Sequence, residues 1–318
     1  MGKVKYVQKK DFKKRLKDVV NHWQLYVMAL PAVVLLFMFA YLPMGGLVIA
    51  FKNYRFRDGI LGSDWADPIY RNFQILFNNN AAAVNAMRNT ILLNLLFIIV
   101  GTAFALVLTL TLNEIRHVLV KRVCQSITFL PHFISWVVVG VFASGFLAFE
   151  TGVINRMLAA LGFDRIGFYM EPSYWPAILL FIVIWRGAGL SAIIYLAAIT
   201  GIDETFYEAA RIDGGTRLQQ IWYITLPLLR PTVIILTLLA VGRIMNADFG
   251  LFYNVTQNMP ILHSTTDVLD TYIFRALRQT GNVAIASATG FFQSVVGFGM
   301  ILLMNGIARR YERDSALF

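Results

Sequence analysis

Six long apolar stretches divide this chain, and polar or charged segments separate them. The apolar stretches fall at residues 27–51, 90–112, 127–149, 175–199, 228–250 and 284–307. A helix of about 20 apolar residues crosses the roughly 30 Å hydrocarbon core of a bilayer, so each stretch is long enough to span a membrane once. Because a backbone in lipid must satisfy its own hydrogen bonds, the pattern predicts an all-α membrane protein with six transmembrane helices.

Two of the connecting segments show a helical pattern of their own. Apolar residues lie on one helical face in residues 153–161, and residues 266–278 repeat this arrangement with charges opposite. Both patterns predict short amphipathic helices lying at the membrane surface. The segment 53–89 mixes aromatic residues with Gly, Asp and Asn, as expected of a compact external loop. These segments can rim a docking platform or simply connect the spans, and the sequence leaves both readings open.

Lys and Arg are distributed unevenly between the connecting segments. If the N-terminus is inside, 17 Lys and Arg residues lie on the inner side and nine on the outer side. Inner loops of membrane proteins carry this excess, so we expect both termini in the cytoplasm. Residues 1–24 hold eight of these cations. They predict a basic cytoplasmic arm, 1–24, followed by a transmembrane domain, 25–318.

The composition agrees with a membrane protein and excludes several other classes. Hydrophobic residues make up 58% of the chain and charged residues 14%. The net charge of +10 comes from basic residues beside apolar stretches, where anionic lipid explains them without a nucleic-acid partner. The single cysteine, Cys124, and four scattered histidines give no disulfide and no metal site. Phosphate-loop, HExxH and GxSxG patterns are absent, so any nucleotide would be hydrolysed by another chain.

A polar island, residues 207–227, lies on the predicted inner side. Just before it, Asp203 can cap a first helix. Gly214 and Gly215 can end that helix, because glycine adopts positive φ without steric cost. The island therefore predicts a compact knob of helix, turn and helix, suited to a cleft in a partner. Spacing alone leaves an ordinary solvated loop as the alternative.

The second half of the island predicts the second helix of the knob. Thr216 and Gln219 have the spacing of a capping box, in which each side chain satisfies a backbone group of the first turn. We expect this helix to run to Leu226 and to be interrupted at Pro227, which lacks an N–H group.

The island also carries a family signature. Glu208, Ala209 and Ala210, three residues, Gly214, nine residues, then ITLP at 224–227 match EAA-x3-G-x9-I-x-LP. This pattern resembles permease subunits of binding-protein-dependent ABC importers. LPHFISW (130–136), IIYLAAITGID (193–203) and DVLDTYIFR (267–275) resemble their carbohydrate-uptake branch, the oligosaccharide and polysaccharide permeases related to the maltose permeases. The resemblance covers residues from about 23 to 318.

The resemblance implies a multi-pass subunit of type I importer architecture in the bacterial cytoplasmic membrane. Its implied partners are a second homologous permease, two cytoplasmic ATPases that bind ATP and Mg, and an extracellular solute-binding protein or lipoprotein. The chain itself would hold no cofactor and no catalytic residue. The loop at about 201–227 would dock on an ATPase, and the coupling residues so implied are Glu208, Ala209, Ala210, Arg211, Asp213, Gly214 and Gly215.

Candidates for the sugar path are polar residues inside the spans, where a central charge costs about 2.5–3.5 kcal/mol. Arg243, Asn246 and Gly250 follow helical spacings of three and four in the fifth span, and Asp248 is nearby. Maltose permeases place sugar-contacting asparagines at a similar distance past the signature proline, and Asn246 matches that region. An Arg243–Asp248 pair, or a polar interface with the second permease, remains an alternative.

A second group of candidates lies in the fourth span. Trp185 can stack on a sugar ring, and Arg186 can donate to hydroxyl or carboxylate groups. Arginines in the path would suit an acidic sugar. Asn94 and Gln293 are further candidates, although such residues also serve in helix packing.

Two other functions remain possible at this stage. The island reports coupling and not cargo, so a permease of the same family could carry another small solute. A membrane scaffold or intramembrane enzyme that merely shares six spans is the alternative of a different class. Such a protein would need no ATPase, whereas the signature in the long inner loop favours the importer.

Overall fold

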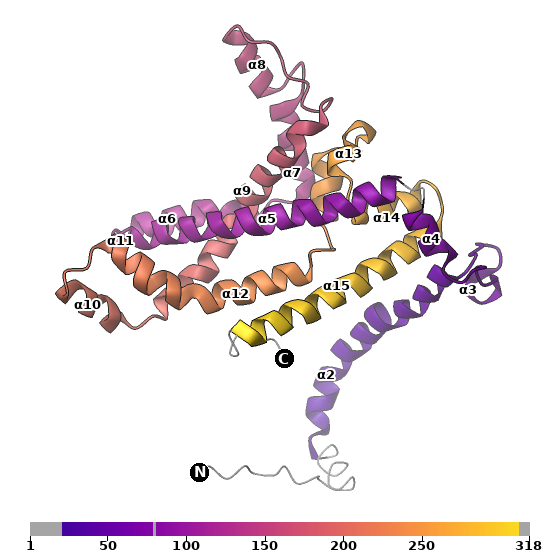
Figure 1. Ribbon diagram of the computed structural model, residues 1–318, viewed down its shortest axis with the longest axis horizontal. Coiled ribbons are helices and arrows are strands. Elements are labelled where there is room, and N and C mark those ends of the chain that lie inside the picture. Colours follow the sequence, from indigo (N-terminus) through magenta and orange to yellow (C-terminus); the bar gives the residue numbers. More distant parts are fainter. Residues whose placement is uncertain (1–20, 79–80, 312–318) are drawn as a thin grey trace.

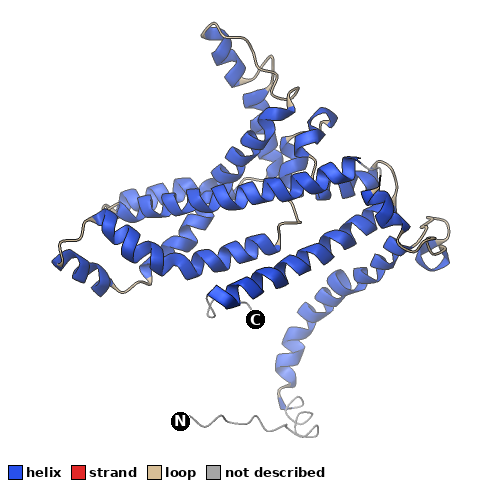
Figure 2. Ribbon diagram, viewed as in Figure 1, coloured by secondary structure: helices blue, strands red, loops and turns tan. Residues whose placement is uncertain are grey.

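The computed structural model describes residues 21–78 and 81–311. These residues form helices joined by short connections (Figure 2). Within the described ranges the only extended pairing is one isolated bridge between Lys52 and Trp65. The predicted all-α class is confirmed. Most of the predicted basic arm, 1–24, lies outside the described residues.

Six spanning units are found in the described part of the chain when one strongly bent pair is counted as a single span. In chain order they consist of α2 (Trp23–Leu36), η1 (Phe37–Tyr41) and η2 (Leu42–Phe51); α5 (Ala81–Glu114); α6 (Val118–Phe129), η3 (Leu130–Phe133) and α7 (Trp136–Leu147); η4 (Pro172–Tyr174) and α9 (Trp175–Thr200); α11 (Arg217–Gln220), η5 (Ile221–Thr225) and α12 (Leu226–Gly242); and α15 (Val283–Tyr311).

Shorter elements connect the spans. They are α3 (Gly59–Gly62), α4 (Arg71–Phe77), α8 (Val153–Ala160), α10 (Glu204–Ile212), η6 (Leu251–Val255), η7 (Pro260–Leu262), α13 (His263–Thr266) and α14 (Leu269–Arg278). The amphipathic helices predicted at 153–161 and 266–278 are confirmed as α8 and α14.

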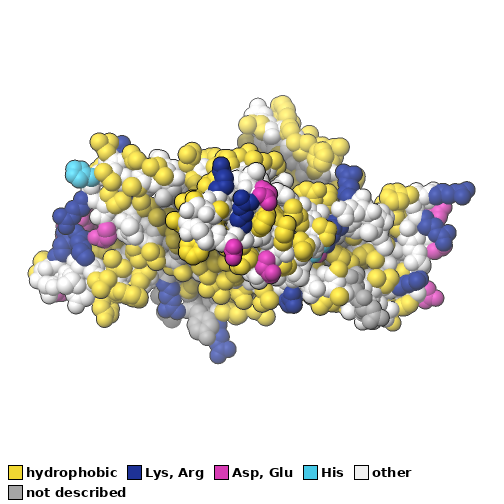
Figure 3. Space-filling view, turned by 90° about the horizontal axis from the view of Figure 1, so that it is seen from above, with side chains coloured by type: hydrophobic (Ala, Val, Ile, Leu, Met, Phe, Trp, Pro, Cys, Tyr) yellow, Lys and Arg dark blue, Asp and Glu magenta, His cyan; other side chains and the backbone are white. Residues whose placement is uncertain are grey.

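Several of the long helices run along the longest axis of the molecule (Figure 1). Figure 1 shows α5, α12 and α15 along this axis, with α10 at one end and α3, α4 and α14 at the other. Seen from above, hydrophobic side chains cover the middle of the molecule, whereas Lys and Arg gather mainly toward the two ends and on the projecting α8 region (Figure 3). This arrangement separates the segments predicted to lie inside from those predicted outside. The orientation of the termini stays a prediction.

The third span differs from its prediction. The sequence predicts one straight helix at 127–149, but the chain bends by 99° between η3 and α7, and α6 already begins at Val118. Pro131 lies in η3, and Ser135 starts α7 by accepting a hydrogen bond from the N–H of Val138. A proline followed by a new N-cap ends one helix and begins another, which the apolar pattern alone cannot reveal.

The fifth span was also predicted wrongly at both ends. The sequence gives a helix at 228–250, with an interruption at Pro227, but the helix runs from Arg217 to Gly242. The missing N–H and the ring of Pro227 would disrupt a regular turn. The wider π turn η5 directly precedes α12, in which Pro227 is the second residue, so the helix continues through the proline. Because residues 243–248 are not helical, the helical stripe predicted for Arg243, Asn246 and Gly250 does not exist.

Two buried clusters hold this interruption, which we call the break (residues 243–248). In one, Trp175 and Leu179 of α9 pack with Val139 of α7 and Phe252 of η6. In the other, Met245 and its neighbour Ile244 pack against Ala86 of α5 and Leu269 of α14. The break therefore lies between spans and the short helix α14, and its backbone is fixed from several sides.

Candidate functional site

The knob (residues 203–225) begins with the helix that the sequence predicts. Asp203 caps α10 by accepting a hydrogen bond from the N–H of Thr205 at 3.0 Å. This hydrogen bond favours the ionised carboxylate and lowers the pKa of Asp203. The predicted N-cap is confirmed, and it fixes where α10 starts relative to α9.

Two glycines end α10 in a Schellman motif. The N–H of Gly215 donates to the carbonyl of Ala210 at 2.7 Å, and the N–H of Gly214 donates to Arg211 at 3.1 Å. Gly214 has φ +80°, the left-handed conformation that this motif needs and that glycine adopts most easily. A Cβ at Gly215 would lie 2.8 Å from the Ala210 carbonyl oxygen. Both glycines are required for a tight turn.

The second helix of the knob is anchored to the first. Thr216 and Gln219 form the predicted capping box. The side chain of Gln220 donates to the carbonyl of Gly215 at 3.2 Å. The hydroxyl groups of Tyr207 and Thr225 lie 3.0 Å apart in a hydrogen bond across the two helices. These contacts confirm a helix, turn and helix of defined shape in place of a solvated loop.

The knob presents an apolar surface beside its charged residues. Ile212 is 86% exposed, and Phe206 and Leu218 are also exposed. Among the residues of the family signature, Glu208 and Ala209 are exposed. Large exposed hydrophobic side chains on a rigid element are typical of a surface that docks on another protein. The coupling residues that the resemblance implies thus lie on and around an accessible face.

A central cavity lies between α5, α9 and the break. It consists of two hollows of about 310 Å³ and 300 Å³ that share lining residues on α5 and α9, among them Asn94 and Gly187. The first hollow reaches Arg243 and Asn246, and the second reaches Asp248.

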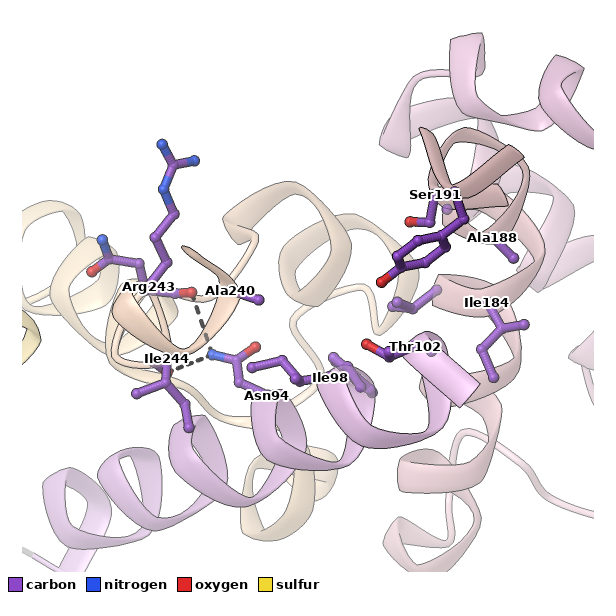
Figure 4. Close-up of a pocket in the computed structure, with 15 residues that line it drawn as sticks. Asn94, Ile98, Thr102, Ile184, Ala188, Ser191, Ala240, Arg243 and Ile244 are labelled. Atoms are coloured by element: carbon purple, nitrogen blue, oxygen red, sulfur yellow. Dashed lines mark hydrogen bonds between the residues drawn. The ribbon is translucent and has the colours of Figure 1, made fainter. Parts of the chain in front are cut away.

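Arg243 and Asn246 lie at the cavity because the helix ends just before them. Both side chains are exposed, and in Figure 4 the Arg243 side chain extends away from α5. Within the described residues the Arg243 guanidinium has no ion pair, so an Arg243–Asp248 pair, one alternative left by the sequence, is not formed.

Arg186 packs against the aromatic ring of Trp136 in the second hollow. Its guanidinium lies 4.1 Å from the centroid of the Trp136 ring, and its Nε donates to the carbonyl of Ile134 at 3.0 Å. The Trp136 indole N–H in turn donates to Asp248 Oδ2 at 2.6 Å. Trp136 thus connects Arg186 with Asp248.

The Asp248 carboxylate accepts its hydrogen bonds from groups of the protein itself. Besides the Trp136 indole, it accepts hydrogen bonds from the backbone N–H groups of Gly250 and Leu251. A Cβ at Gly250 would lie 2.4 Å from the Trp136 ring. Asp248 therefore caps the segment after the break and orients Trp136, which leaves little acceptor capacity for a ligand.

Asn94 and Gln293 bind the backbone of the break. The amide of Asn94 donates to the carbonyl of Ile244 at 2.7 Å (Figure 4) and to that of Asn246 at 3.3 Å. The amide of Gln293 donates to the carbonyl of Met245 at 2.7 Å. Gln293 is buried, so its amide group serves the fold.

Trp185 lies away from the other candidates. It borders an apolar groove of about 770 Å³ between α7 and α9 rather than the central cavity, so the structure separates it from Arg186. Sequence reasoning missed Trp136 and the stripe Gly187, Ser191 and Tyr195, which lines the first hollow. Their spacing of four residues on one helix is the signal that could have found the stripe.

The comparisons with known proteins agree with this architecture. The family described as binding-protein-dependent transport system inner membrane component matches residues 98–313. The polygalacturonan/rhamnogalacturonan transport system permease protein YteP of Bacillus subtilis (strain 168) is 34% identical over 311 residues, which cover 96% of this chain and 94% of the relative. Protein LplB of the same organism is also 34% identical, over 92% of this chain and 90% of its own length.

A solved structure resembles the whole molecule. It is a crystal structure of a bacterial ABC transporter involved in the import of the acidic polysaccharide alginate. One of its chains superposes with a TM-score of 0.85 at 35% identity, covering 94% of this chain and 99% of that chain. The resemblance inferred from the EAA signature is confirmed. The chain belongs to the family of binding-protein-dependent transport system inner membrane components, the multi-pass permease subunits of ABC importers in the bacterial plasma membrane.

Proposed function

We propose that this permease imports acidic oligosaccharides through the central cavity. The observation that carries the proposal is the pair of arginines at that cavity, Arg186 and Arg243. In the described residues neither guanidinium has a carboxylate within ion-pair distance. An anionic sugar passing between them would supply the missing partner.

The free-energy cost of placing these two arginines in the spans indicates that they bind a charged ligand. A central arginine in a span costs about 2.5–3.5 kcal/mol, and a cation–π contact such as that of Arg186 with Trp136 returns about 0.5–2 kcal/mol. Arg243 has no such contact among the described residues. A carboxylate that binds both N–H groups of a guanidinium fork would offset this cost. Two similar proteins support an acidic substrate: one is named for the transport of polygalacturonan/rhamnogalacturonan, and the other belongs to a transporter involved in the import of the acidic polysaccharide alginate.

The proposal includes the partners of the transporter. The knob docks on an ATPase, which binds ATP and Mg and hydrolyses the nucleotide. A second permease completes the path, and an external binding protein delivers the sugar; a related complex contains a periplasmic protein bound to an alginate pentasaccharide. Glu208 is exposed on the knob, so Glu208→Lys is expected to abolish ATP-driven uptake while membrane insertion stays normal. Normal uptake by this variant would remove Glu208 from the coupling surface.

The substrate class is tested with the intact transporter in proteoliposomes. We expect oligogalacturonate or oligoalginate, presented on the binding protein, to stimulate ATP hydrolysis and uptake, and a neutral oligosaccharide of the same length to do so weakly. Arg186→Gln and Arg243→Gln are expected to raise KM for the acidic sugar about tenfold or more, the loss of one charge-assisted hydrogen bond. Equal stimulation by the neutral sugar, with unchanged KM in both variants, would refute an acidic substrate.

A further inference from the structure

The break presents Arg243 and Asn246 to the cavity without a helix to hold them. In lipid an interrupted backbone survives only if other parts of the protein bind its polar groups. In the break, three side chains from separate helices bind backbone groups of four consecutive residues, 244–247. The side chains are Asn94 on α5, Gln293 on α15 and Asp270 on α14.

Asp270 is the centre of this arrangement. Its Oδ2 accepts the backbone N–H of Ala247 at 2.8 Å and the amide of Gln293 at 3.2 Å. Gln293 at the same time donates to Met245. One carboxylate oxygen therefore joins α14, the last span and the break.

We propose that Asp270, Gln293 and Asn94 form a clamp that sets the position of the break, and that Asp270 is a positioning residue for substrate binding. The proposal rests on the proposed function in so far as Arg243 and Asn246 contact the sugar. Asp270 itself does not line either hollow of the central cavity. Its effect on substrate runs through the backbone that carries the contacting side chains.

The neighbouring Asp267 provides a matched control. It is also buried and precedes the same helix, where it pairs with Arg275 and accepts a hydrogen bond from Thr271. No hydrogen bond joins Asp267 to the break in the described residues. Asp267→Ala thus perturbs α14 without removing a clamp contact, whereas Asp270→Ala removes the acceptor of the Ala247 N–H.

The first measurement needs no substrate. Hydrogen exchange of residues 243–248 is followed by mass spectrometry in the assembled transporter without sugar. Asp270→Ala is expected to speed exchange of this segment about tenfold, the effect of losing a buried hydrogen-bond acceptor. Asp270→Asn keeps a carbonyl oxygen for the Ala247 N–H and should restore most of the protection. Asp267→Ala should leave the exchange of this segment unchanged.

The second measurement is uptake by the same variants. Asp270→Ala is expected to raise KM for the transported sugar about tenfold, with basal ATP hydrolysis and the amount of assembled complex unchanged, and Asp270→Asn should rescue it. Unchanged exchange in Asp270→Ala would overturn the clamp, whichever sugar is carried. Faster exchange with unchanged KM, or an equal effect of Asp267→Ala, would overturn the positioning role. If acidic and neutral sugars prove equal, the substrate proposal fails while the exchange result still decides the clamp.

Discussion

Replacing Gly214 by a series of other residues isolates the backbone geometry of the knob. Gly214 has φ +80°, and a Cβ built there would meet no atom within 4 Å. The cost of a side chain is therefore conformational strain alone. The left-handed region costs an ordinary L-residue roughly 1–2 kcal/mol, which corresponds to a factor of about 5–30 in an equilibrium. Asn visits this region more readily, and a β-branched residue least readily.

The series predicts a graded loss of docking. If the ATPase binds the knob only with its tight turn, Gly214→Asn should weaken the affinity of the permease pair for the ATPase slightly, Gly214→Ala about 5–30-fold, and Gly214→Val further. The affinity is measured with the permease pair in nanodiscs and added ATPase. Sugar uptake is measured with the same variants and should fall in the same order.

A matched control is available in the connection after α8. Gly162 has φ +83°, and a Cβ there also meets nothing within 4 Å. Gly162→Ala introduces the same backbone strain far along the chain from the knob, so ATPase affinity should stay unchanged. The reasoning is refuted if Gly214→Ala and Gly214→Val bind the ATPase with normal affinity, or if Gly162→Ala weakens binding as much as Gly214→Ala.

Three further predictions concern the knob and the cavity. In a double-mutant cycle of Tyr207→Phe and Thr225→Val, the coupling energy for ATPase binding should be about 1 kcal/mol, the value of one hydrogen bond; a value near zero would contradict the anchor. Gly187 lines both hollows and has open space at its Cβ position. Gly187→Ala should transport normally and Gly187→Phe should block uptake with assembly intact, and normal uptake by Gly187→Phe would place the path elsewhere. Arg186→Lys should raise KM for uptake more than Arg243→Lys, because of these two residues Arg186 alone uses its guanidinium to bind a backbone carbonyl. A larger rise of KM in Arg243→Lys would contradict this role.

The knob could be predicted from the sequence because its signals are local. The cap at Asp203, the left-handed turn at Gly214 and the capping box of Thr216 and Gln219 each depend on residues within a few positions of one another. The extension of the helix through Pro227 was missed because the π turn before it has no comparable sequence signal. Local chemistry therefore predicted the shape of the knob better than it predicted where its second helix ends.

The break could not be predicted from local sequence. Half of residues 241–250 are hydrophobic, and none is proline, so the sequence pattern extends a helix through them. The partners that satisfy the broken backbone are distant in the chain: Asn94 lies 150 residues from Ile244, and Gln293 lies 48 residues from Met245. The sequence marked Asn94 and Gln293 as polar residues in spans, but their role depends on tertiary contacts. The part they would play in the sugar path stays a prediction.

The two interruptions of the spans are in contact beside the second hollow of the central cavity. Arg186 binds the carbonyl of Ile134 at the bend between η3 and α7, and Trp136, two residues later, binds Asp248 at the break. Irregular backbone at membrane depth is tolerated only where protein buries it or where it lines a water-filled cavity. Both interruptions combine these conditions, since one side of each is bound by side chains and the other borders the cavity. The same contacts that make the irregular backbone stable thus place arginine and aromatic groups where a hydrated, charged sugar would pass.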